Sequence, residues 1–262
     1  MEEEQDNNQS ETTTSETTKL RGTVLVEHGI VFEKDGLVLQ ARHYYQQGLN
    51  ALLSMLTPAE HQFGNAGFFE RVEQYGLRIT QINNHIKDMV KGAKPVEVTR
   101  IPAQTYGYNY EIIFGQYLTD DTRELLIEEP VMEDICHFKN LRSFLELLVA
   151  KCRCLEFVEL CTPRNKDKKG ADLQETALCQ LKNDMGTVKR YFGFRFDNNI
   201  KEMRLIFDNG CVVRTESNGL HQFERAQDKL ELDGQLFSET KGDIIHIYRS
   251  PRTFRHVLER LL

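Results

Sequence analysis

Apolar residues spaced three or four positions apart over residues 38–89 are the feature that most constrains the fold of this chain. The first stretch contains Val38, Ala41, Tyr45, Gly48, Leu49, Leu52 and Leu56. The second stretch contains Phe69, Val72, Ile79, Ile82, Ile86 and Met89. Residues with this spacing fall on one face of an α-helix, so each stretch predicts an amphipathic helix. Gly92 and Pro95 follow the second stretch and indicate where its helix ends.

A third, shorter helix is predicted ahead of these two. Residues 20–34 are apolar at several positions, and the polar residues from Glu33 to Gly36 separate them from the next helix. Helices of this kind with short connections bury their apolar faces against one another. The sequence therefore predicts an all-α three-helix bundle over residues 20–92.

The pattern changes near residue 96, where short β-rich runs begin to alternate with helical ones. The β-rich runs include residues 124–129 and 155–162, and the helical runs include residues 138–151 and 173–185. Alternation of this kind indicates an α/β domain. Asp208-Asn209-Gly210 lies between two later β-rich runs and predicts a hairpin turn.

These patterns predict a multidomain protein. An α/β domain over residues 105–262 follows the helical bundle, and a linker over residues 93–104, with two prolines and alternating charges, joins them. Residues 1–19 are predicted to be a disordered acidic tail. Their Glu, Thr, Ser, Asn and Gln side chains bury too little apolar surface to offset the entropy of ordering them.

The net charge of −7 comes mostly from that tail, because residues 1–18 hold six acidic side chains and no basic one. The remainder is nearly neutral, whereas a strong nucleic-acid binder is usually basic, so we expect no nucleic-acid partner. No apolar run approaches the roughly 18 residues of a membrane-spanning helix. The N-terminal Met-Glu-Glu-Glu also lacks the features of a secretory signal, so we expect a cytoplasmic protein.

The chain has six cysteines, which we expect to be reduced thiols in that compartment. The tightest group is Cys152, Cys154 and Cys161, and its spacing does not match that of a structural zinc site. If residues 151–161 form a strand, Cys152 and Cys154 share a face with Val158 and pack in the core. No metal or cofactor is expected.

Residues 29–49, GIVFEKDGLVLQARHYYQQGL, resemble the junction between the first and second helices of MIT domains. These are three-helix microtubule-interacting and trafficking modules. Glu33 stands where the family usually has Asp, and Val38 stands where it usually has an aromatic residue. The resemblance implies close helix packing at Gly29, Ala41, Tyr45 and Gly48.

The rest of the chain resembles the phospholipase-D-like domain that follows the MIT domain in a family of proteins of cytokinetic abscission. The matching stretches are GYNYEIIFGQYL at 107–118, LLIEEP at 125–130, IFDNG at 206–210 and GLHQF at 219–223. Together the two resemblances cover about residues 20–262. They imply an MIT bundle followed by an α/β domain with a phospholipase-D-like fold.

The resemblance also implies partners for both domains. MIT domains hold an amphipathic helix from the C-terminal tail of an ESCRT-III subunit in a groove between two helices. The corresponding peptide-binding positions here are Thr80, Asn83, Asn84 and Lys87. Asn83-Asn84 stands where the family often has Ala-Glu, and the lost carboxylate weakens contact with a basic residue of the peptide. For the second domain, the resemblance implies membrane contact and homodimerisation.

A phospholipase D active site requires two His-x-Lys-x4-Asp motifs, which supply a nucleophile, a proton donor and phosphate-binding lysines. His137 is followed by Lys139, but Phe144 stands where the Asp is required. His246 is followed by Tyr248 in place of the lysine. We therefore expect no enzymatic activity and assign no catalytic residue. An active phosphodiesterase on lipid or nucleic acid is the alternative.

Glu128-Glu129 is a carboxylate pair at the end of a predicted strand. Adjacent residues of a strand point to opposite faces, so the two carboxylates do not share one acid–base or metal site. We expect a structural or hydrogen-bonding role for both.

Two groups of basic residues are candidates for contact with acidic phospholipid, because lipid phosphates attract clustered Lys and Arg side chains. The first group, interleaved with aromatic residues, is Lys189, Arg190 and Arg195. The second group, near the C-terminus, is Arg249, Arg252 and Arg255. An ordinary solvated surface is the alternative interpretation of both groups.

The sequence as a whole predicts a non-enzymatic adaptor. In this interpretation the MIT domain binds ESCRT-III tails, and a dimeric, catalytically silent phospholipase-D-like domain contacts acidic membrane. We expect a peripheral location on endosomal or midbody membranes. A purely structural protein scaffold without lipid contact is a third interpretation.

Overall fold

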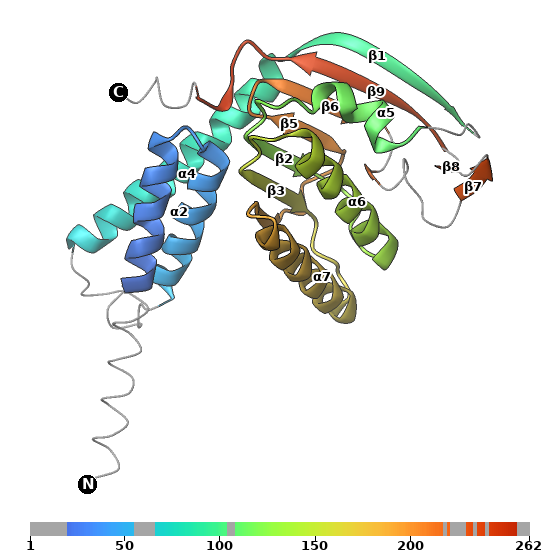
Figure 1. Cartoon of the computed structure of the whole chain (residues 1–262). Helices are drawn as coiled ribbons and strands as arrows, with labels where there is room; N and C mark the ends of the chain where they lie inside the picture. Colours follow the sequence, from blue (N-terminus) through green and yellow to red (C-terminus); the bar gives the residue numbers. More distant parts are fainter. Residues whose placement is uncertain are drawn as a thin grey trace. The chain divides into compact units, whose positions relative to one another are not determined.

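The chain forms two compact units in a computed structural model (Figure 1). The structure describes residues 20–54, 66–103, 108–216, 219–220, 229–232, 235–238 and 241–255. The predicted disordered tail therefore lies outside the described residues. The first unit, here called the helical unit, comprises Met1–Asp88 together with Phe254–Leu262. The second, the sheet unit, comprises Met89–Thr253. The helical unit is thus built from both ends of the sequence.

Helices form at each of the three positions where apolar spacing predicts them. The first covers residues 20–34, α2 covers Val38–Leu53 and α4 covers Ala66–Gly92. The residues of the apolar spacing become the core of these helices, because Val38, Ala41, Tyr45, Leu52, Ile79, Ile82, Ile86 and Met89 are all buried. Amphipathic spacing at this length was sufficient to place the helices.

Close contact between the first helix and α2 depends on glycine. A Cβ atom on Gly29 would lie 2.7 Å from Cδ1 of Tyr45 and 3.2 Å from the carbonyl oxygen of Ala41. A Cβ atom on Gly48 would lie 2.6 Å from Cγ2 of Val26. Contacts this short leave no room for a larger side chain. The packing positions implied by the MIT resemblance therefore do lie in contact.

A single carboxylate connects the three helices. The hydroxyl of Tyr45 on α2 donates to Oε2 of Glu33 over 2.6 Å, and the guanidinium of Arg78 on α4 forms an ion pair with Oε1 of Glu33. Burial raises the pKa of Tyr45 to about 12, so its hydroxyl remains a donor at neutral pH. Arg42 on α2 also donates to Oδ1 of Asn83 on α4 over 2.7 Å. These polar contacts join the helices beside their apolar core.

The sheet unit contains a seven-stranded mixed sheet in the order β1-β9-β6-β5-β2-β3-β4. Its strands are β1 (Lys94–Ala103), β2 (Glu124–Glu128), β3 (Phe157–Thr162), β4 (Tyr191–Phe196), β5 (Arg204–Phe207), β6 (Cys211–Thr215) and β9 (Lys241–Arg249). The pairs β2–β3 and β3–β4 are parallel and the other pairs are antiparallel. Two further strands, β7 (Lys229–Leu232) and β8 (Gln235–Ser238), form a separate antiparallel pair.

Helices connect the parallel strands because a parallel connection must cross back over the sheet. α6 (Ile135–Lys151) links β2 to β3, and α7 (Lys168–Thr187) links β3 to β4 (Figure 1). Each helix begins at an aspartate whose side chain accepts a backbone N–H of the first turn, Asp134 for α6 and Asp167 for α7. The alternating pattern of the sequence correctly predicted an α/β architecture.

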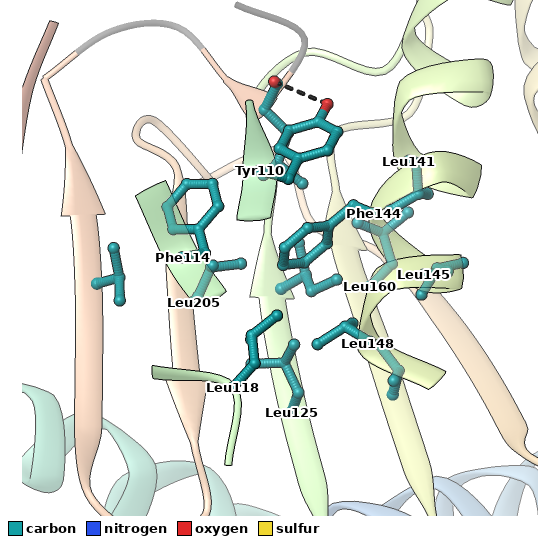
Figure 2. Packing of buried hydrophobic residues seen from close by; sticks show 14 of the residues in the cluster. Tyr110, Phe114, Leu118, Leu125, Leu141, Phe144, Leu145, Leu148, Leu160 and Leu205 are labelled. Atoms are coloured by element: carbon teal, nitrogen blue, oxygen red, sulfur yellow. Dashed lines mark hydrogen bonds between the residues drawn. The ribbon is translucent and has the colours of Figure 1, made fainter. Parts of the chain in front are cut away.

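Apolar side chains of the strands and helices form the core of the sheet unit. Leu125 of β2, Leu160 of β3 and Leu205 of β5 point toward the helices (Figure 2). Tyr110 and Phe114, both in the short helix α5 (Tyr110–Phe114), pack their rings against Phe144 of α6, with ring centroids 5.4 Å and 5.7 Å away. Edge-to-face aromatic contacts of this kind add to the burial of apolar area.

The predicted linker differs from the structure, in which it forms strand β1. β1 pairs antiparallel with β9 along most of its length, from Lys94 opposite Arg249 to Ala103 opposite Lys241. Prolines in this segment indicated a linker, but β1 is an edge strand of the sheet, where proline is tolerated. The partner strand lies far away in the sequence, so local patterns could not reveal the pairing.

The hairpin predicted at Asp208-Asn209-Gly210 joins the antiparallel strands β5 and β6. Gly210 has a φ of 87°, a conformation that favours glycine.

Cys154 differs from its predicted core position and is exposed, whereas Cys152 is buried. The reason is that β3 begins only at Phe157, so Cys154 lies in the turn that precedes it. None of the described helices is long and apolar enough to cross a membrane.

Glu128 and Glu129 have separate roles at the end of β2. Glu128 forms an ion pair with Arg204 of β5. Glu129 is 1% exposed and accepts the backbone N–H of Leu220 over 2.8 Å and that of Val131 over 3.3 Å. The hydroxyl of Tyr110 donates to the carbonyl oxygen of Leu220 over 3.0 Å (Figure 2). The prediction of hydrogen-bonding roles is therefore confirmed for both carboxylates.

Burial raises the pKa of Glu129 to about 8, despite two backbone hydrogen bonds that favour its ionised form. Because the folded-state pKa lies above the unfolded value, Glu129 stabilises the fold most at low pH and loses this contribution as the pH rises toward 8. Glu129→Gln removes the titration but leaves one backbone amide without an acceptor, at a cost of about 1–3 kcal/mol.

We expect the parent to be more stable than Glu129→Gln at pH 5 and to lose this advantage in unfolding free energy as the pH rises to 9. Urea unfolding of the full chain at several pH values measures it. Glu133→Gln, which alters an exposed carboxylate, is the control and should follow the parent at every pH. Parallel profiles for the parent and Glu129→Gln would contradict the assigned titration.

Candidate functional site

The turn between α7 and β4 presents an exposed combination of basic and apolar side chains. Val188 and Tyr191 are 48% and 57% exposed, and Lys189 is exposed between them. The backbone N–H of Arg190 donates to the carbonyl oxygen of Met185, and that of Lys189 donates to the carbonyl oxygen of Gly186. This pattern of two hydrogen bonds is the Schellman ending of a helix.

Lys189 occupies the position of this motif where glycine is usual. Its φ is 57°, and it is the only non-glycine residue with a positive φ in the described part of the chain. A left-handed conformation costs an ordinary L-residue about 1–2 kcal/mol relative to its preferred regions. The fold therefore holds the backbone of a charged residue, at the tip of this turn, in a conformation that glycine would adopt more easily.

A third basic residue joins this turn from another connection. Arg190 donates from Nη2 to the carbonyl oxygen of Arg153 over 2.9 Å, and the side chain of Arg153 is 83% exposed. Arg153 also lies 3.7 Å from Asp120, a weak exposed ion pair. We call the surface formed by Arg153, Val188, Lys189, Arg190 and Tyr191 the basic turn.

Sequence reasoning missed Arg153, although topology offered a signal for it. The α6–β3 and α7–β4 connections both lead into the N-terminal ends of neighbouring parallel strands. They therefore lie next to each other at the same end of these strands. Cationic groups beside an exposed tyrosine and valine suit the boundary between lipid headgroups and acyl chains. The basic turn is the candidate functional site of the sheet unit.

Arg195, predicted to belong with Lys189 and Arg190, lies in a different environment. Its guanidinium is 3.6 Å from Glu159 and 3.6 Å from Asp197, and the Glu159 side chain is only 3% exposed. Arg195 lies four positions after Tyr191 along β4, about 13 Å of strand. The carboxylates neutralise Arg195, so it does not contribute free positive charge to the basic turn.

Other charged residues continue from Arg195 across the sheet. The strand register places Glu128 opposite Arg204, Arg204 opposite Arg214, and Arg214 opposite His246. Glu202 lies 2.7 Å from Arg214 and 3.5 Å from Arg204. Nε2 of His246 is 2.8 Å from Glu216. Every arginine of this row faces a carboxylate, so the row forms a neutralised network and lacks the character of an anion site.

The predicted C-terminal arginines are divided between the two units. Arg249 and Arg252 belong to the sheet unit, where Arg249 lies opposite Lys94 of β1. Arg255 belongs to the helical unit, and its Cγ would lie 3.5 Å from a Cβ atom on Gly36. The structure therefore does not describe these three residues as one group.

His137 acts as a helix cap in this structure. Its backbone N–H donates to Oδ1 of Asp134 over 3.0 Å, and its Nδ1 accepts the backbone N–H of Glu133 over 3.1 Å. A second His-x-Lys pair, which sequence reasoning missed, is His85 and Lys87 on α4. No histidine of the chain has both Lys two positions later and Asp seven positions later.

The described residues contain no group of three His, Cys, Asp or Glu side chains that could hold a metal ion. All six cysteines lie among the described residues and are free. Burial raises the pKa of Cys152 to about 11 and that of Cys161 to about 12. Buried thiols with such pKa values remain protonated and are poor nucleophiles at neutral pH.

The positions predicted to bind a peptide lie on two sides of α4. Thr80, Asn84 and Lys87 are exposed at helical spacing, and Leu77, one turn earlier, is 55% exposed. Residues spaced this way share one face of a helix, so we call these four residues the α4 face. Asn83 points instead toward α2, where it accepts the hydrogen bond from Arg42.

Comparison with known proteins supplies a family for this architecture. The family model described as "Phospholipase D-like domain at C-terminus of MIT" matches residues 107–241. MIT domain-containing protein 1 of Mus musculus is 22% identical over 227 residues, covering 85% of this chain and 90% of the mouse protein. The crystal structure of Nuc, a phospholipase D family member from Salmonella typhimurium, aligns with a TM-score of 0.34 and 14% identity. That alignment covers 64% of this chain and 91% of Nuc.

The family match extends over half of the chain and over most of the sheet unit. It includes β2, the two crossover helices and the hairpin between β5 and β6. The chain belongs to the family of phospholipase D-like domains found at the C-terminus of MIT.

Proposed function

We propose that this protein is a non-enzymatic adaptor that links ESCRT-III tails to acidic membrane during cytokinetic abscission. The helical unit is the tail-binding MIT domain, and the phospholipase D-like sheet unit contacts lipid as a homodimer. The protein is cytoplasmic and acts peripherally at endosomal or midbody membranes. The single observation that carries the membrane part of this proposal is the strained Lys189 at the tip of the basic turn.

The basic turn supports lipid contact by its charge and by its geometry. Among the residues that the structure describes, its cations have one weak carboxylate partner, Asp120, whereas Arg195, Arg204 and Arg214 all face carboxylates. Each basic residue near an anionic surface contributes about 1 kcal/mol of attraction. A homodimer carries two such turns, and two weak attachments on one particle bind much more tightly than one.

The helical unit supports the role of an MIT domain. Its three described helices follow the family order, and Gly29 packs against Tyr45 as the resemblance implies. The α4 face offers an apolar Leu77 beside polar side chains, which suits an amphipathic helix as partner. MIT domain-containing protein 1, the mouse relative, carries the name of this module.

The roles of the histidines support an adaptor over a phosphodiesterase. His137 caps a helix and His246 pairs with Glu216, and neither belongs to a His-x-Lys-x4-Asp motif. A fold that is used for catalysis elsewhere can serve binding alone, because function depends on the site. Turnover of a phosphodiester substrate that is abolished by His137→Ala would favour the alternative of an active enzyme.

Tail binding can be tested on the α4 face. Asn84→Glu restores the carboxylate that the family often has, and it should tighten binding to tails with a basic residue at the matching position by about threefold. Calorimetry of the full chain against a panel of ESCRT-III C-terminal peptides measures the change. Asn183→Asp adds the same charge on α7 of the sheet unit, where the side chain is exposed, and should leave affinity unchanged. Failure of every peptide to bind the folded protein would rule out the tail-binding role.

Membrane contact can be tested by reversing charge at the basic turn. The double change Lys189→Glu with Arg190→Glu should weaken binding to vesicles containing phosphatidylserine by at least tenfold, and the loss should shrink as salt rises. Vesicle sedimentation at several salt concentrations measures the change in affinity. The control, Lys168→Glu with Lys169→Glu, makes the same charge change at the opposite end of α7. Equal losses for both variants would show that overall charge, and not the basic turn, governs binding.

The strain at Lys189 predicts opposite effects on stability and on membrane binding. Lys189→Gly should raise the unfolding free energy by up to about 1 kcal/mol, because glycine adopts this φ without steric cost. The same change should weaken vesicle binding several-fold through loss of one charge. Lys189→Gln, which retains the strain, should weaken binding without any gain in stability. A Gly variant that gains stability and binds vesicles as the parent does would exclude Lys189 from the lipid contact.

A further inference from the structure

Two cations face each other at one end of the β1–β9 ladder. β1 and β9 run side by side (Figure 1), and their register places Lys94, the first residue of β1, directly opposite Arg249, the last residue of β9. Directly opposite residues have Cβ atoms about 5 Å apart on the same face of the sheet, so like charges there repel each other. Both residues are exposed. We call Lys94 and Arg249 the strand-end pair.

Elsewhere in the same sheet, a carboxylate bridges a pair of cations of this kind. Arg204 of β5 lies opposite Arg214 of β6, and Glu202 lies 3.5 Å from the first and 2.7 Å from the second. Within the described part of the chain, neither Lys94 nor Arg249 has a carboxylate within 4.0 Å. The strand-end pair therefore lacks the bridging anion that the other pair has.

The strand neighbours of Arg249 supply no counter-charge either. On its β6 side, Arg249 lies opposite Cys211, a buried thiol. Glu97 is two pairs further along the β1–β9 ladder. Its carboxylate accepts hydrogen bonds from the hydroxyl of Tyr117 over 3.0 Å and from that of Thr99 over 3.3 Å. Glu97 is thus engaged within the sheet unit, and the charge of Arg249 stays available to an external anion.

The segment just before β1 leaves room for a ligand beside the strand-end pair. A Cβ atom on Gly92, two residues before Lys94, would meet no other atom within 4 Å. Lys91, in the last turn of α4, is exposed and carries a further positive charge. An anion approaching the strand-end pair from this side meets open space and positive charge.

Strand directions place the strand-end pair at the same end of the sheet as the basic turn. β5 is antiparallel to β2, β6 to β5, and β9 to β6. β9 therefore ends, and β1 begins, where the parallel strands β2, β3 and β4 begin. Five strand spacings, about 25 Å, separate β9 from β4, the strand that follows the basic turn. This end of the sheet thus carries available cations near both of its edges.

We propose that the strand-end pair binds a phosphate group of a lipid headgroup and is a second point of membrane contact in each protomer. The phosphate takes the bridging place that Glu202 holds between Arg204 and Arg214. Arginine can donate two parallel hydrogen bonds to a phosphate, and lysine adds a point charge. Contact at the basic turn and at the strand-end pair together orients this end of the sheet toward the membrane and raises affinity. The assignment to lipid rests on the proposed membrane function.

The test is Lys94→Glu in the full chain, which turns the strand-end pair into a cross-strand ion pair. The urea midpoint of unfolding should rise, because opposite charges across two strands attract. Sedimentation with phosphatidylserine vesicles should show binding weakened about fivefold or more, because the site has lost its net positive charge. Lys169→Glu makes the same charge change at the opposite end of the sheet, and this control should bind vesicles as the parent does. Arg249→Gln removes the other cation and serves as a second variant if Lys94→Glu does not fold.

Inorganic phosphate provides a second measurement that needs no membrane. At equal ionic strength, replacing chloride by phosphate should raise the urea midpoint of the parent and of Lys169→Glu more than that of Lys94→Glu. The reason is that a ligand stabilises the folded state only where it binds, whereas the general effect of phosphate on protein surfaces is common to all three proteins.

The possible results separate the anion site from the membrane function. A folded Lys94→Glu variant that matches the parent with vesicles and with phosphate would overturn the proposal, even if the basic turn proves essential. Weaker vesicle binding would uphold the lipid contact, and a phosphate effect beside it would show that the phosphate group itself is recognised. A phosphate effect with unchanged vesicle binding would overturn the lipid contact. A phosphate effect in a parent that binds no vesicle would uphold the anion site and refute the membrane function.

Discussion

Parallel pairing of β2, β3 and β4 is the constraint on which the rest of the sheet unit depends. Each parallel connection needs a helix that returns across the sheet, so α6 and α7 must pack on it, and Phe144 of α6 meets the rings of Tyr110 and Phe114 there. The same requirement brings the C-terminal ends of both helices to the end of the sheet where the parallel strands begin. The α6–β3 and α7–β4 turns therefore meet, and the hydrogen bond from Arg190 to Arg153 joins them into the basic turn.

Neighbouring carboxylates decide which basic residues remain available to a partner. Arg195, Arg204 and Arg214 lie on strands, where the register brings acidic residues of adjacent strands beside them. Lys189 lies in the turn that leads into β4, the last strand in the order of the sheet, and is exposed. A sheet interior favours such neutralised networks because an unpaired charge there is costly. Positive charge that can contact another molecule is consequently found at the connections between helices and strands. The strained backbone of Lys189 places its charge in such a connection.

The helical unit combines close packing with polar contacts and draws on both ends of the chain. Gly29 and Gly48 let the first helix approach α2, and Glu33 joins the first helix to Tyr45 of α2 and Arg78 of α4. Phe254 adds a buried side chain from the far end of the sequence.

The sequence alone determined the features that depend on local interactions. Helical spacing placed α2 and α4, Asp208-Asn209-Gly210 placed a hairpin, and a missing Asp argued against a phospholipase motif at His137. Only the tertiary structure decided that the predicted linker is β1, because its partner β9 lies more than a hundred residues later. It also separated Arg195 from Lys189, grouped Arg255 with the helices and brought Arg153 to the basic turn. Helix and turn patterns arise within a few residues, whereas strand pairing and charge neutralisation depend on residues that are distant in sequence and adjacent only in the folded chain.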